Sequence, residues 1–364
     1  MRGRPALYTA YAQDMALLDT PGKRRGVAGI VAAAAVLPFV VTDDLLVVLS
    51  LGLVASIGAI GLNLVTGYAG QVSLGHAFFI GLGAYTAAVV GSDPERARAL
   101  TLGITSLPVW LLAAGAVSAV AGLLIAPLAV RLRGLYLAIV TLGLVFLGDH
   151  LFKEATPLTG GVGVGRAAAK LEVLGFDLSQ GRWLSSEQQT YLLMLALLVL
   201  FALIGRNIAR SAVGRAFAAV RDRDIAAEVI GVNLARQKAL AFTVSSFYAG
   251  VTGALFYTVS GFLEPTEFGL LLSIQYIAMV LIGGVATISG SIMGALFIST
   301  LGRFTREVSG SLPFVGELGG GGAFQLEAIL YGLLIVGFLI FEPRGLYGIW
   351  TRVRNYWKEW PYSY

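Results

Sequence analysis

The sequence contains no cysteine, two histidines and few charged residues, since Asp, Glu, Lys and Arg make up only 13% of its 364 residues. Without cysteine the chain can form neither disulfides nor thiolate metal sites. The two histidines, His76 and His150, lie far apart in the sequence, which argues against a histidine metal cluster. The sequence therefore predicts no metal site.

A phosphate-binding loop of the form G-x-x-x-x-G-K-[ST] is also missing. The only Gly-Lys pair, Gly22-Lys23, lacks both the upstream glycine and the following hydroxyl residue. If a nucleotide drives this protein, another chain must bind it.

Ionisable groups inside the apolar segments are scarce, although such groups commonly mark proton or ion relays. Those within or at the ends of these segments are His76, Asp149, His150 and Glu327. The last three lie near the predicted outer boundary of the membrane. A proton-coupled mechanism would more naturally place a carboxylate near mid-membrane, so we expect a different source of energy.

The chain is instead rich in apolar residues. Hydrophobic residues make up 57% of it, against about 45–50% in an average soluble domain. Apolar runs recur from residue 26 to residue 341, and no polar block between them is long enough to fold separately. We therefore predict an all-α, polytopic membrane helix bundle over residues 26–341. A cytoplasmic N-terminal segment (1–25) precedes it, and a basic, aromatic cytoplasmic tail (342–364) follows.

A membrane-spanning helix needs about 20 mostly apolar residues. The ten candidate spans are Gly26–Val41, Leu45–Thr66, Gln71–Val90, Gly103–Val130, Gly134–Phe152, Thr190–Gly205, Lys238–Gly261, Leu270–Ala286, Gly290–Leu301 and Phe324–Phe341. An even number of spans puts both termini on one side, although residues 270–301 could hold one span fewer or more. The first run follows three basic residues, as in a cleaved signal peptide, but it ends without a small-x-small cleavage pattern, which favours a retained span.

The distribution of Lys and Arg predicts the orientation. With both termini in the cytoplasm, 18 of the 26 Lys and Arg residues fall in the inner segments 1–25, 131–133, 206–238 and 342–364. This bias follows the positive-inside rule. The net charge of +5 then indicates contact with anionic membrane lipid, and no role in binding nucleic acid is expected. The longest outer segment, Lys153–Gln189, is expected to be an external loop that could hold a short helix or hairpin.

The most basic inner loop, residues 206–237, contains the polar stretch "GRAFAAVRDRDIAAEVIGVN". Asp222 or Asp224 can cap the start of a helix there, and Gly231 suits its end. At about 100° per residue, one arc of roughly 140° holds the apolar residues Ile225, Ala226, Val229 and Ile230. This face could dock in a partner's groove, lie on the lipid surface or pack under its own bundle.

A glycine-rich break separates two apolar segments at "LNLVTGYAGQVSLGHAFF". Its glycines are Gly67, Gly70 and Gly75, and the nearby polar side chains are Asn63, Gln71, Ser73 and His76. Broken helices in transporters expose backbone groups to a cavity, so these four polar residues are candidates for the translocation path. Close helix packing explains the glycines equally well, and His76 alone is better explained as a hydrogen-bonded packing residue. A weaker counterpart, "IGGVATISGS", contains Gly283, Gly284 and Gly290.

Several stretches together resemble the permeases of ATP-binding-cassette importers, in particular those for branched-chain amino acids. They are "GLNLVTGYAGQVSLGHAFFIGLGAYTAA" from Gly61, "LRGLYLAIVTLG" from Leu132, "GRAFAAVRDRDIAAEVIGVNLARQKALAF" from Gly214, "LIGGVATISGSIMGA" from Leu281 and "FEPRGLYGIW" from Phe341. The resemblance covers roughly Leu45 to Trp350. The first 40 residues match nothing specific, and "LTGGVGVG" lacks the acid that often follows this start in the family.

The resemblance implies a permease subunit in the plasma membrane, which is a transporter component and not an enzyme. It also implies a second related permease, two cytoplasmic ATPase subunits that bind ATP and Mg, and an extracytoplasmic substrate-binding protein. In such importers, closure of the ATPases acts through a cytoplasmic coupling segment. The family-like positions of that segment are Gly214, Arg215, Asp222, Glu228 and Gly231, with Asp224 in the same stretch.

Alternatives of two kinds remain open. Similar permeases serve urea, short amides or other amino acids, because the binding protein does much of the selecting. From a different class, a stand-alone channel or ion-coupled transporter would also explain the polar, glycine-rich break. A membrane enzyme is a more distant alternative, since the sequence shows no nucleophile–base pair.

Overall fold

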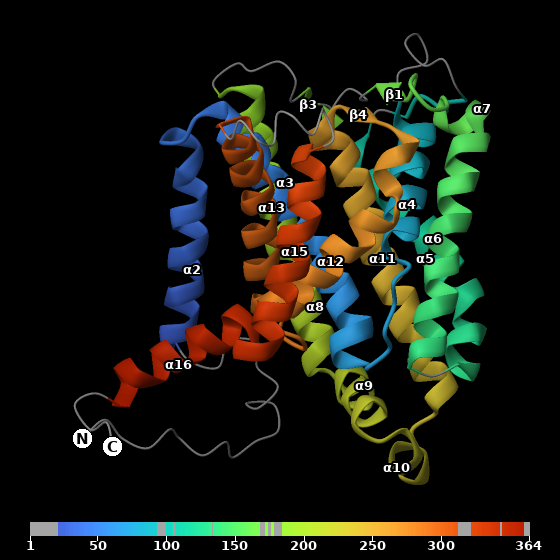
Figure 1. Cartoon of the computed structure of the whole chain (residues 1–364), viewed down its shortest axis with the longest axis vertical. Helices are drawn as coiled ribbons and strands as arrows, with labels where there is room; N and C mark the ends of the chain where they lie inside the picture. Colours follow the sequence, from blue (N-terminus) through green and yellow to red (C-terminus); the bar gives the residue numbers. More distant parts are fainter. Residues whose placement is uncertain are drawn as a thin grey trace.

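The computed structural model describes residues 21–92, 100–104, 106–132, 134–167, 172–173, 176–177, 184–311, 322–342 and 344–359. These residues form an all-α bundle with a few short strands at one end (Figure 1). The first half consists of α2 (Pro21–Val36), η1 (Leu37–Phe39), α3 (Asp43–Asn63), the π-helical η2 (Leu64–Tyr68), α4 (His76–Gly91), α5 (Leu107–Arg131), α6 (Leu135–Glu154), α7 (Thr156–Thr159), β1 (Arg166–Ala167), β2 (Glu172–Val173) and β3 (Phe176–Asp177). The second half consists of α8 (Ser186–Arg210), α9 (Ala212–Asp222), α10 (Asp224–Val229), α11 (Leu234–Ser260), β4 (Phe262–Leu263), η3 (Pro265–Phe268), α12 (Leu270–Gly283), α13 (Ile288–Ser311), α15 (Gly322–Phe341) and α16 (Gly345–Glu359).

Each of the ten predicted spans overlaps one α-helix of the bundle. Among the described residues, five helices are long and apolar enough to cross a membrane, namely α3 with η2, α5, α6, α8 and α11. The apolar helices α4 and α12 are shorter, because the chain leaves the helical path beside each of them. The predicted span Gln71–Val90 is therefore helical only from His76 onward, whereas α13 continues well beyond the predicted end at Leu301.

Local sequence signals set several helix boundaries. α8 begins with a capping box, in which the Gln188 N–H donates to Ser185 Oγ at 3.2 Å and the Ser185 N–H donates to Gln188 Oε1 at 3.1 Å. α5 has a proline in its first turn, where a helix needs no N–H donor. α11 ends at Gly261, whose φ of 71° forms a left-handed cap.

The two ends of the bundle differ in structure (Figure 1). α9, α10 and α16 gather at the end where α2 begins, and α7 and the strands lie at the opposite end. There β1 pairs with β4, while β2 and β3 form a hairpin, so the expectation of a short helix or hairpin after Lys153 is confirmed. Residues 1–20 and 360–364 of the two predicted terminal segments lie outside the described residues. That the end carrying α10 faces the cytoplasm stays a prediction from the positions of Lys and Arg.

α11 lies at the centre of the bundle and packs against α3, α4 and α5. Small residues bring these helices together, because a Cβ on Gly253 would collide with the carbonyl of Ile80, and one on Gly83 with the main chain of Gly250. Lipid tails are as apolar as the side chains, so membrane helices associate mainly through such close packing. The glycines of α4 and α11 therefore help to hold the bundle together.

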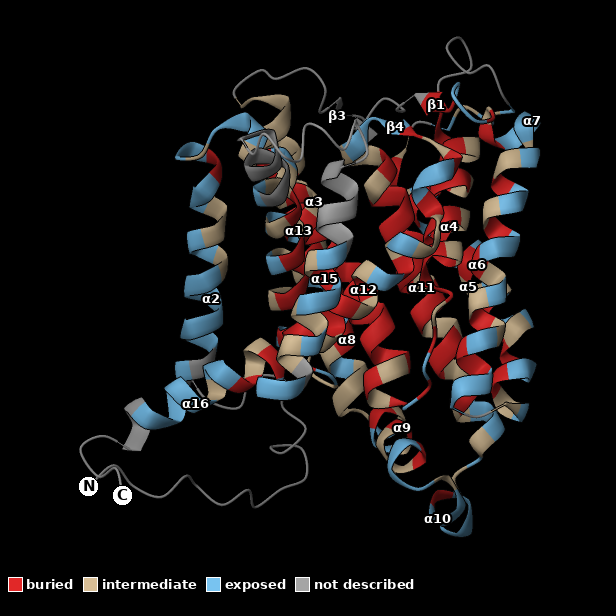
Figure 2. Ribbon diagram, in the orientation of Figure 1, coloured by how far each residue is buried: buried red, intermediate tan, exposed pale blue. Residues whose placement is uncertain are grey.

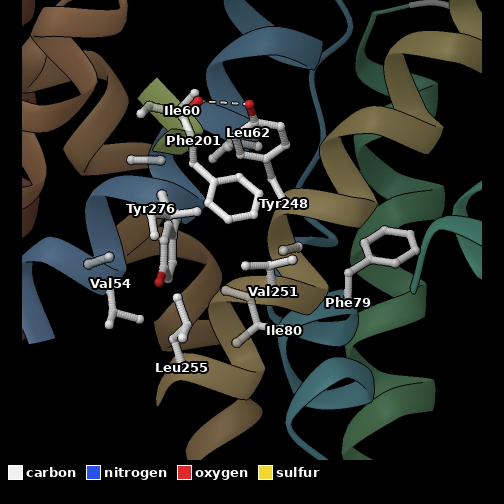
Figure 3. Packing of buried hydrophobic residues seen from close by; sticks show 14 of the residues in the cluster. Val54, Ile60, Leu62, Phe79, Ile80, Phe201, Tyr248, Val251, Leu255 and Tyr276 are labelled. Atoms are coloured by element: carbon white, nitrogen blue, oxygen red, sulfur yellow. Dashed lines mark hydrogen bonds between the residues drawn. The ribbon is translucent and has the colours of Figure 1, made fainter. Parts of the chain in front are cut away.

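Large side chains fill the space between α3, α8, α11 and α12 (Figure 3). Tyr248 on α11 packs edge-on against Phe201 on α8, with ring centroids 5.3 Å apart. The Tyr248 hydroxyl donates to the Phe201 carbonyl at 2.9 Å, which satisfies a polar group that would be costly to bury alone.

The outer surface of the bundle is apolar as well. Figure 2 shows buried residues along α3, α4 and α11 and exposed residues on the outward faces of α2, α5 and α6. Many of these exposed residues are large and hydrophobic, such as Leu124 on α5 and Leu135 on α6. A surface of this kind is suited to lipid contact and would be an aggregation liability in water.

The first prediction concerns the close contact between α4 and α11. Gly253→Val should lower the midpoint of thermal unfolding in detergent, because overpacking a tight contact typically costs about 1–3 kcal/mol and here forces two backbones apart. Gly143→Val on α6 is the matched control, since a Cβ there meets nothing within 4 Å. Equal midpoints for both variants would contradict the packing role of Gly253.

Candidate translocation and coupling site

The chain leaves the helix after Tyr68, runs through residues 69–75 without helical structure and enters α4 at His76. Gly70 has a φ of 68°, a left-handed conformation that glycine adopts readily. Gln71, Ser73 and His76 are all buried. Irregular backbone at membrane depth is tolerated only where protein buries it or where it lines a cavity. The extended segment 69–75 therefore needs other hydrogen-bond partners, and the Gln71 N–H finds one at the Val65 carbonyl, 2.9 Å away in the preceding turn.

Hydroxyl groups on two other helices supply further partners, one for this segment and one for the first turn of α4. The Leu74 N–H donates to Thr141 Oγ1 on α6 at 2.9 Å. The Ala77 N–H donates to Ser273 Oγ on α12 at 3.0 Å. Sequence reasoning missed both residues, whose only signal is a hydroxyl within an apolar helix.

Asn63 connects this break to the second one, between α12 and α13. Its Nδ2 donates to Ser291 Oγ at 2.7 Å and to the Thr287 carbonyl at 3.0 Å, and its Oδ1 accepts the Ala286 N–H at 2.8 Å. The Asn63 side chain is fully buried. The two glycine-rich breaks are therefore in direct contact, and in this conformation Asn63 joins helices within the protein interior.

The predicted break glycines lie at close contacts within these two regions. A Cβ on Gly67 would collide with the Asn63 amide, and one on Gly75 would come within 3.0 Å of the Thr141 carbonyl. Gly283 packs against the carbonyl of Gly290, and Gly284 has a φ of 127°. This geometry accommodates close packing, and the proposed role in a path stays a prediction.

Gln71 and His76 combine burial with unused hydrogen-bonding capacity. Within the described part of the chain, no partner reaches Gln71 Nε2, Gln71 Oε1 or His76 Nε2. The His76 ring forms a hydrogen bond with the Gly58 backbone, and its centroid lies 5.0 Å from the centroid of the Tyr276 ring. Buried polar groups are normally satisfied, so these atoms are available to a polar solute or to water.

The coupling stretch forms two helices, although only one was predicted. α9 starts at Ser211, whose Oγ accepts the N–H groups of Val213 and Gly214. Phe217 and Val220 are buried, and α9 packs on α8, α11 and η2. Gly214 lies against the end of α8, and the exposed Arg215 donates to the Arg210 carbonyl at 3.2 Å. α9 is therefore anchored to the bundle.

α10 protrudes from the end of the bundle (Figure 1). Its N-cap is Arg223, so the prediction that Asp222 or Asp224 caps this helix is wrong. The reason is that α9 continues to Asp222 and leaves only Arg223 in extended conformation before Asp224 starts α10. The predicted role of Gly231 at the helix end is confirmed, because its φ is 87° and the Val232 N–H reaches the Ala227 carbonyl at 2.9 Å.

The predicted apolar face of this stretch points away from the bundle. Ile225, Val229 and Ile230 are 70%, 83% and 74% exposed, and only Ala227 of α10 is buried. Glu228 is also exposed. Packing of this face under its own bundle is thereby excluded, which leaves a partner protein or the lipid surface to cover it.

Arg221 brings the coupling segment into contact with the first break. Its Nη1 donates to the Gly67 carbonyl at 3.1 Å, and its Nε pairs with Asp222 Oδ1 at 3.0 Å. Gly70 packs against the Arg221 main chain, where a Cβ would come within 3.0 Å of the Arg221 Cα. Sequence reasoning did not single out Arg221, because the contact joins residues far apart in the chain.

A buried arginine fastens the opposite end of the bundle. Arg166 Nη1 donates to the Leu158 carbonyl at 2.6 Å and Nη2 to the Leu100 carbonyl at 2.9 Å. Burial lowers the pKa of Arg166, but an arginine pKa starts so high that the group stays charged. Nearby on α6, Lys153 and Asp149 form an ion pair at 2.7 Å.

Comparison with known proteins identifies the family. The model of the family described as "Branched-chain amino acid transport system / permease component" matches residues 45–339. The chain belongs to this family. Family membership makes the chain a transporter component, and together with its long apolar helices it makes the chain a multi-pass protein of the plasma membrane.

Individual relatives support the same assignment. The high-affinity branched-chain amino acid transport system permease protein LivM of Escherichia coli is 30% identical over 85% of this chain and 71% of its own length. BraD of Pseudomonas aeruginosa, a permease protein of the same kind of system, is 26% identical over 82% and 93%. The autoinducer 2 import system permease protein LsrC of an Enterobacter species is 31% identical over 66% and 64%. No solved structure matches the chain significantly.

The second prediction concerns Asn63. Asn63→Ala should lower the midpoint of thermal unfolding, because it leaves the partly buried Ala286 N–H without its acceptor, at a cost of about 1–3 kcal/mol. Asn207→Ala is the control, because Asn207 lies exposed on α8. If both variants unfold like the wild type, Asn63 does not hold the two breaks together.

Proposed function

We propose that this permease forms part of the path for branched-chain amino acids in an ATP-binding-cassette importer. The observation that carries the proposal is the exposed apolar face of α10, on a protruding segment of a chain that lacks a phosphate-binding loop of its own. Exposed apolar patches rimmed by charge mark protein interaction sites. A face of this kind suits a groove on an ATPase subunit, which would supply the energy that the chain cannot obtain from nucleotide itself.

The proposed assembly contains a second related permease, two cytoplasmic ATPase subunits, an extracytoplasmic substrate-binding protein and surrounding membrane lipid. ATP and Mg bind to the ATPases in this scheme. The coupling contacts are assigned to α10 and its flanks, at Gly214, Arg215, Asp222, Asp224, Glu228 and Gly231. Family membership supports this arrangement.

Branched-chain amino acids are the proposed substrate because LivM and BraD are described as permeases for them. LsrC, whose name refers to autoinducer 2, matches a smaller part of this chain. The deciding experiment is uptake into liposomes that contain both permeases and the ATPases, with the binding protein added outside. Uptake of leucine, isoleucine or valine should require ATP and the binding protein. Uptake by the purified chain alone would instead support a channel or an ion-coupled transporter.

The candidate path runs along the extended segment and the start of α4. Gln71, Ser73 and His76 lie there, and Asn63 holds the adjoining break. The positive end of the α4 dipole favours a negatively charged group such as the carboxylate of an amino acid, although the Ala77 N–H of its first turn is already bonded to Ser273 Oγ. The unused polar atoms of Gln71 and His76 support this assignment.

The third prediction tests the apolar face of α10. The double variant Ile225→Ser/Val229→Ser should weaken retention of the ATPase subunits at least tenfold, because burial of one such side chain is worth about 1.5–3 kcal/mol. Val40→Ser is the matched control, since Val40 is 78% exposed and follows η1 at the opposite end of the bundle. Undiminished retention by the double variant would leave lipid as the partner of this face.

The fourth prediction separates a path from packing at Gln71. Gln71→Leu removes polar atoms that have no partner among the described residues, so it should leave the thermal midpoint unchanged or raise it. Import should nevertheless fall, because the polar contact with substrate is lost. If the midpoint falls as well, Gln71 stabilises the fold and the path lies elsewhere.

A further inference from the structure

We propose that Arg221 is a positioning residue that passes movement of the coupling helices to both helix breaks. This inference rests on the proposed function and adds a specific physical link to it. The link runs from α9 through the Arg221 side chain to the Gly67 carbonyl, and from Gly67 through Asn63 to the loop between α12 and α13.

The first contact fills a position that the end of a helix leaves open. The chain leaves its helical path after Tyr68, so the Gly67 carbonyl has no following helical turn to supply its N–H donor. Arg221 Nη1 donates to this carbonyl at 3.1 Å from a residue on α9. Asp222 pairs with Arg221 Nε at 3.0 Å and so orients the guanidinium. The end of the π-helical turn is therefore held by the coupling segment.

Gly70 supplies a second contact at the same place. Its φ of 68° turns the chain into the extended segment, and its lack of a side chain lets the backbone lie directly on Arg221. A Cβ at Gly70 would come within 3.0 Å of both Cα and Cβ of Arg221. Arg221 thus contacts the break on both sides of the point where the helix ends.

The second break is connected through Asn63. Gly67 lies directly against the Asn63 side chain, and a Cβ at Gly67 would also come within 2.6 Å of the Ala286 nitrogen. Asn63 in turn binds Ala286, Thr287 and Ser291. A displacement of the Gly67 carbonyl therefore reaches the loop between α12 and α13 through atoms already in contact.

The two coupling helices differ in burial, and this difference indicates that movement passes from α10 to α9 and then to the breaks. α10 is almost entirely exposed, so it can receive a push from a partner. α9 is fixed to α8, α11 and η2 through Phe217 and Val220, so it moves with those elements. Arg221 lies at the end of α9 next to α10, between the exposed helix and the anchored one.

The experiment compares Arg221→Ala and Arg221→Lys with the wild type in the complete reconstituted importer. Arg236→Ala is the matched control, because it removes the same charge from an exposed position in the first turn of α11. Three quantities are measured: retention of the ATPases, the rate of ATP hydrolysis and the amount of substrate imported per ATP hydrolysed. A purely structural role of Arg221 would change ATPase retention or protein stability together with import. A coupling role changes only the amount of substrate imported per ATP hydrolysed.

We expect Arg221→Ala to retain its ATPases and to hydrolyse ATP while importing at least tenfold less substrate per ATP. Arg221→Lys should recover most of the loss, because its ammonium group can donate to the same carbonyl. Arg236→Ala should behave like the wild type. Wild-type import per ATP in Arg221→Ala, or loss of the ATPases in step with import, would overturn the proposal.

A second measurement needs no change at Arg221 and so remains valid if those variants misfold. The chain has no cysteine, so spin labels can be placed on Ala212→Cys in α9 and Val72→Cys in the extended segment, both of which are exposed. The distance between them should stay constant when ATP is added to the assembled importer. A changed distance would overturn the link. Failure of the proposed function differs from both results, because the wild type would then bind no ATPase or import without ATP.

Discussion

The arrangement of this bundle depends on one requirement, that every backbone polar group inside a membrane must find a hydrogen-bond partner. Regular helices meet it internally, but within its described residues the chain leaves the helix at two glycine-rich breaks inside the bundle, after Tyr68 and after Gly283. At each break, side chains from distant parts of the sequence supply the missing partners, through Thr141 and Ser273 at one and Asn63 at the other. Hydrogen bonds at the breaks therefore join α3, α4, α6, α12 and α13 to one another.

The same requirement makes the breaks suitable places for movement. A continuous helix exchanges its hydrogen bonds only by unfolding a turn, whereas a bond between a hydroxyl and a loop N–H can be exchanged by a small rotation. Transporters in general place irregular backbone where substrate crosses the mid-membrane region. In this chain, the segment that lacks helical bonds also contains Gln71, and its neighbour His76 starts α4, each with buried polar atoms that have no partner in the described structure.

Sequence reasoning predicted the helices well, because each is an apolar run and composition alone indicates burial or lipid contact. It also found both breaks, since clustered glycine interrupts such runs. It misplaced the cap of α10, because the polar stretch predicts one helix, whereas the buried Phe217 and Val220 anchor a separate helix, α9. The roles of Thr141, Ser273 and Arg221 come from contacts between residues distant in sequence, which no local pattern contains.

The exposed face of α10 also has a consequence for the synthesis of the protein. The apolar face of α10 is uncovered in the isolated subunit, where its exposed side chains are Ile225, Val229 and Ile230. Such a surface is an aggregation liability in water, and either a partner protein or the membrane surface can cover it. An isolated subunit would therefore be prone to self-association through this face until a partner protein or lipid covers it.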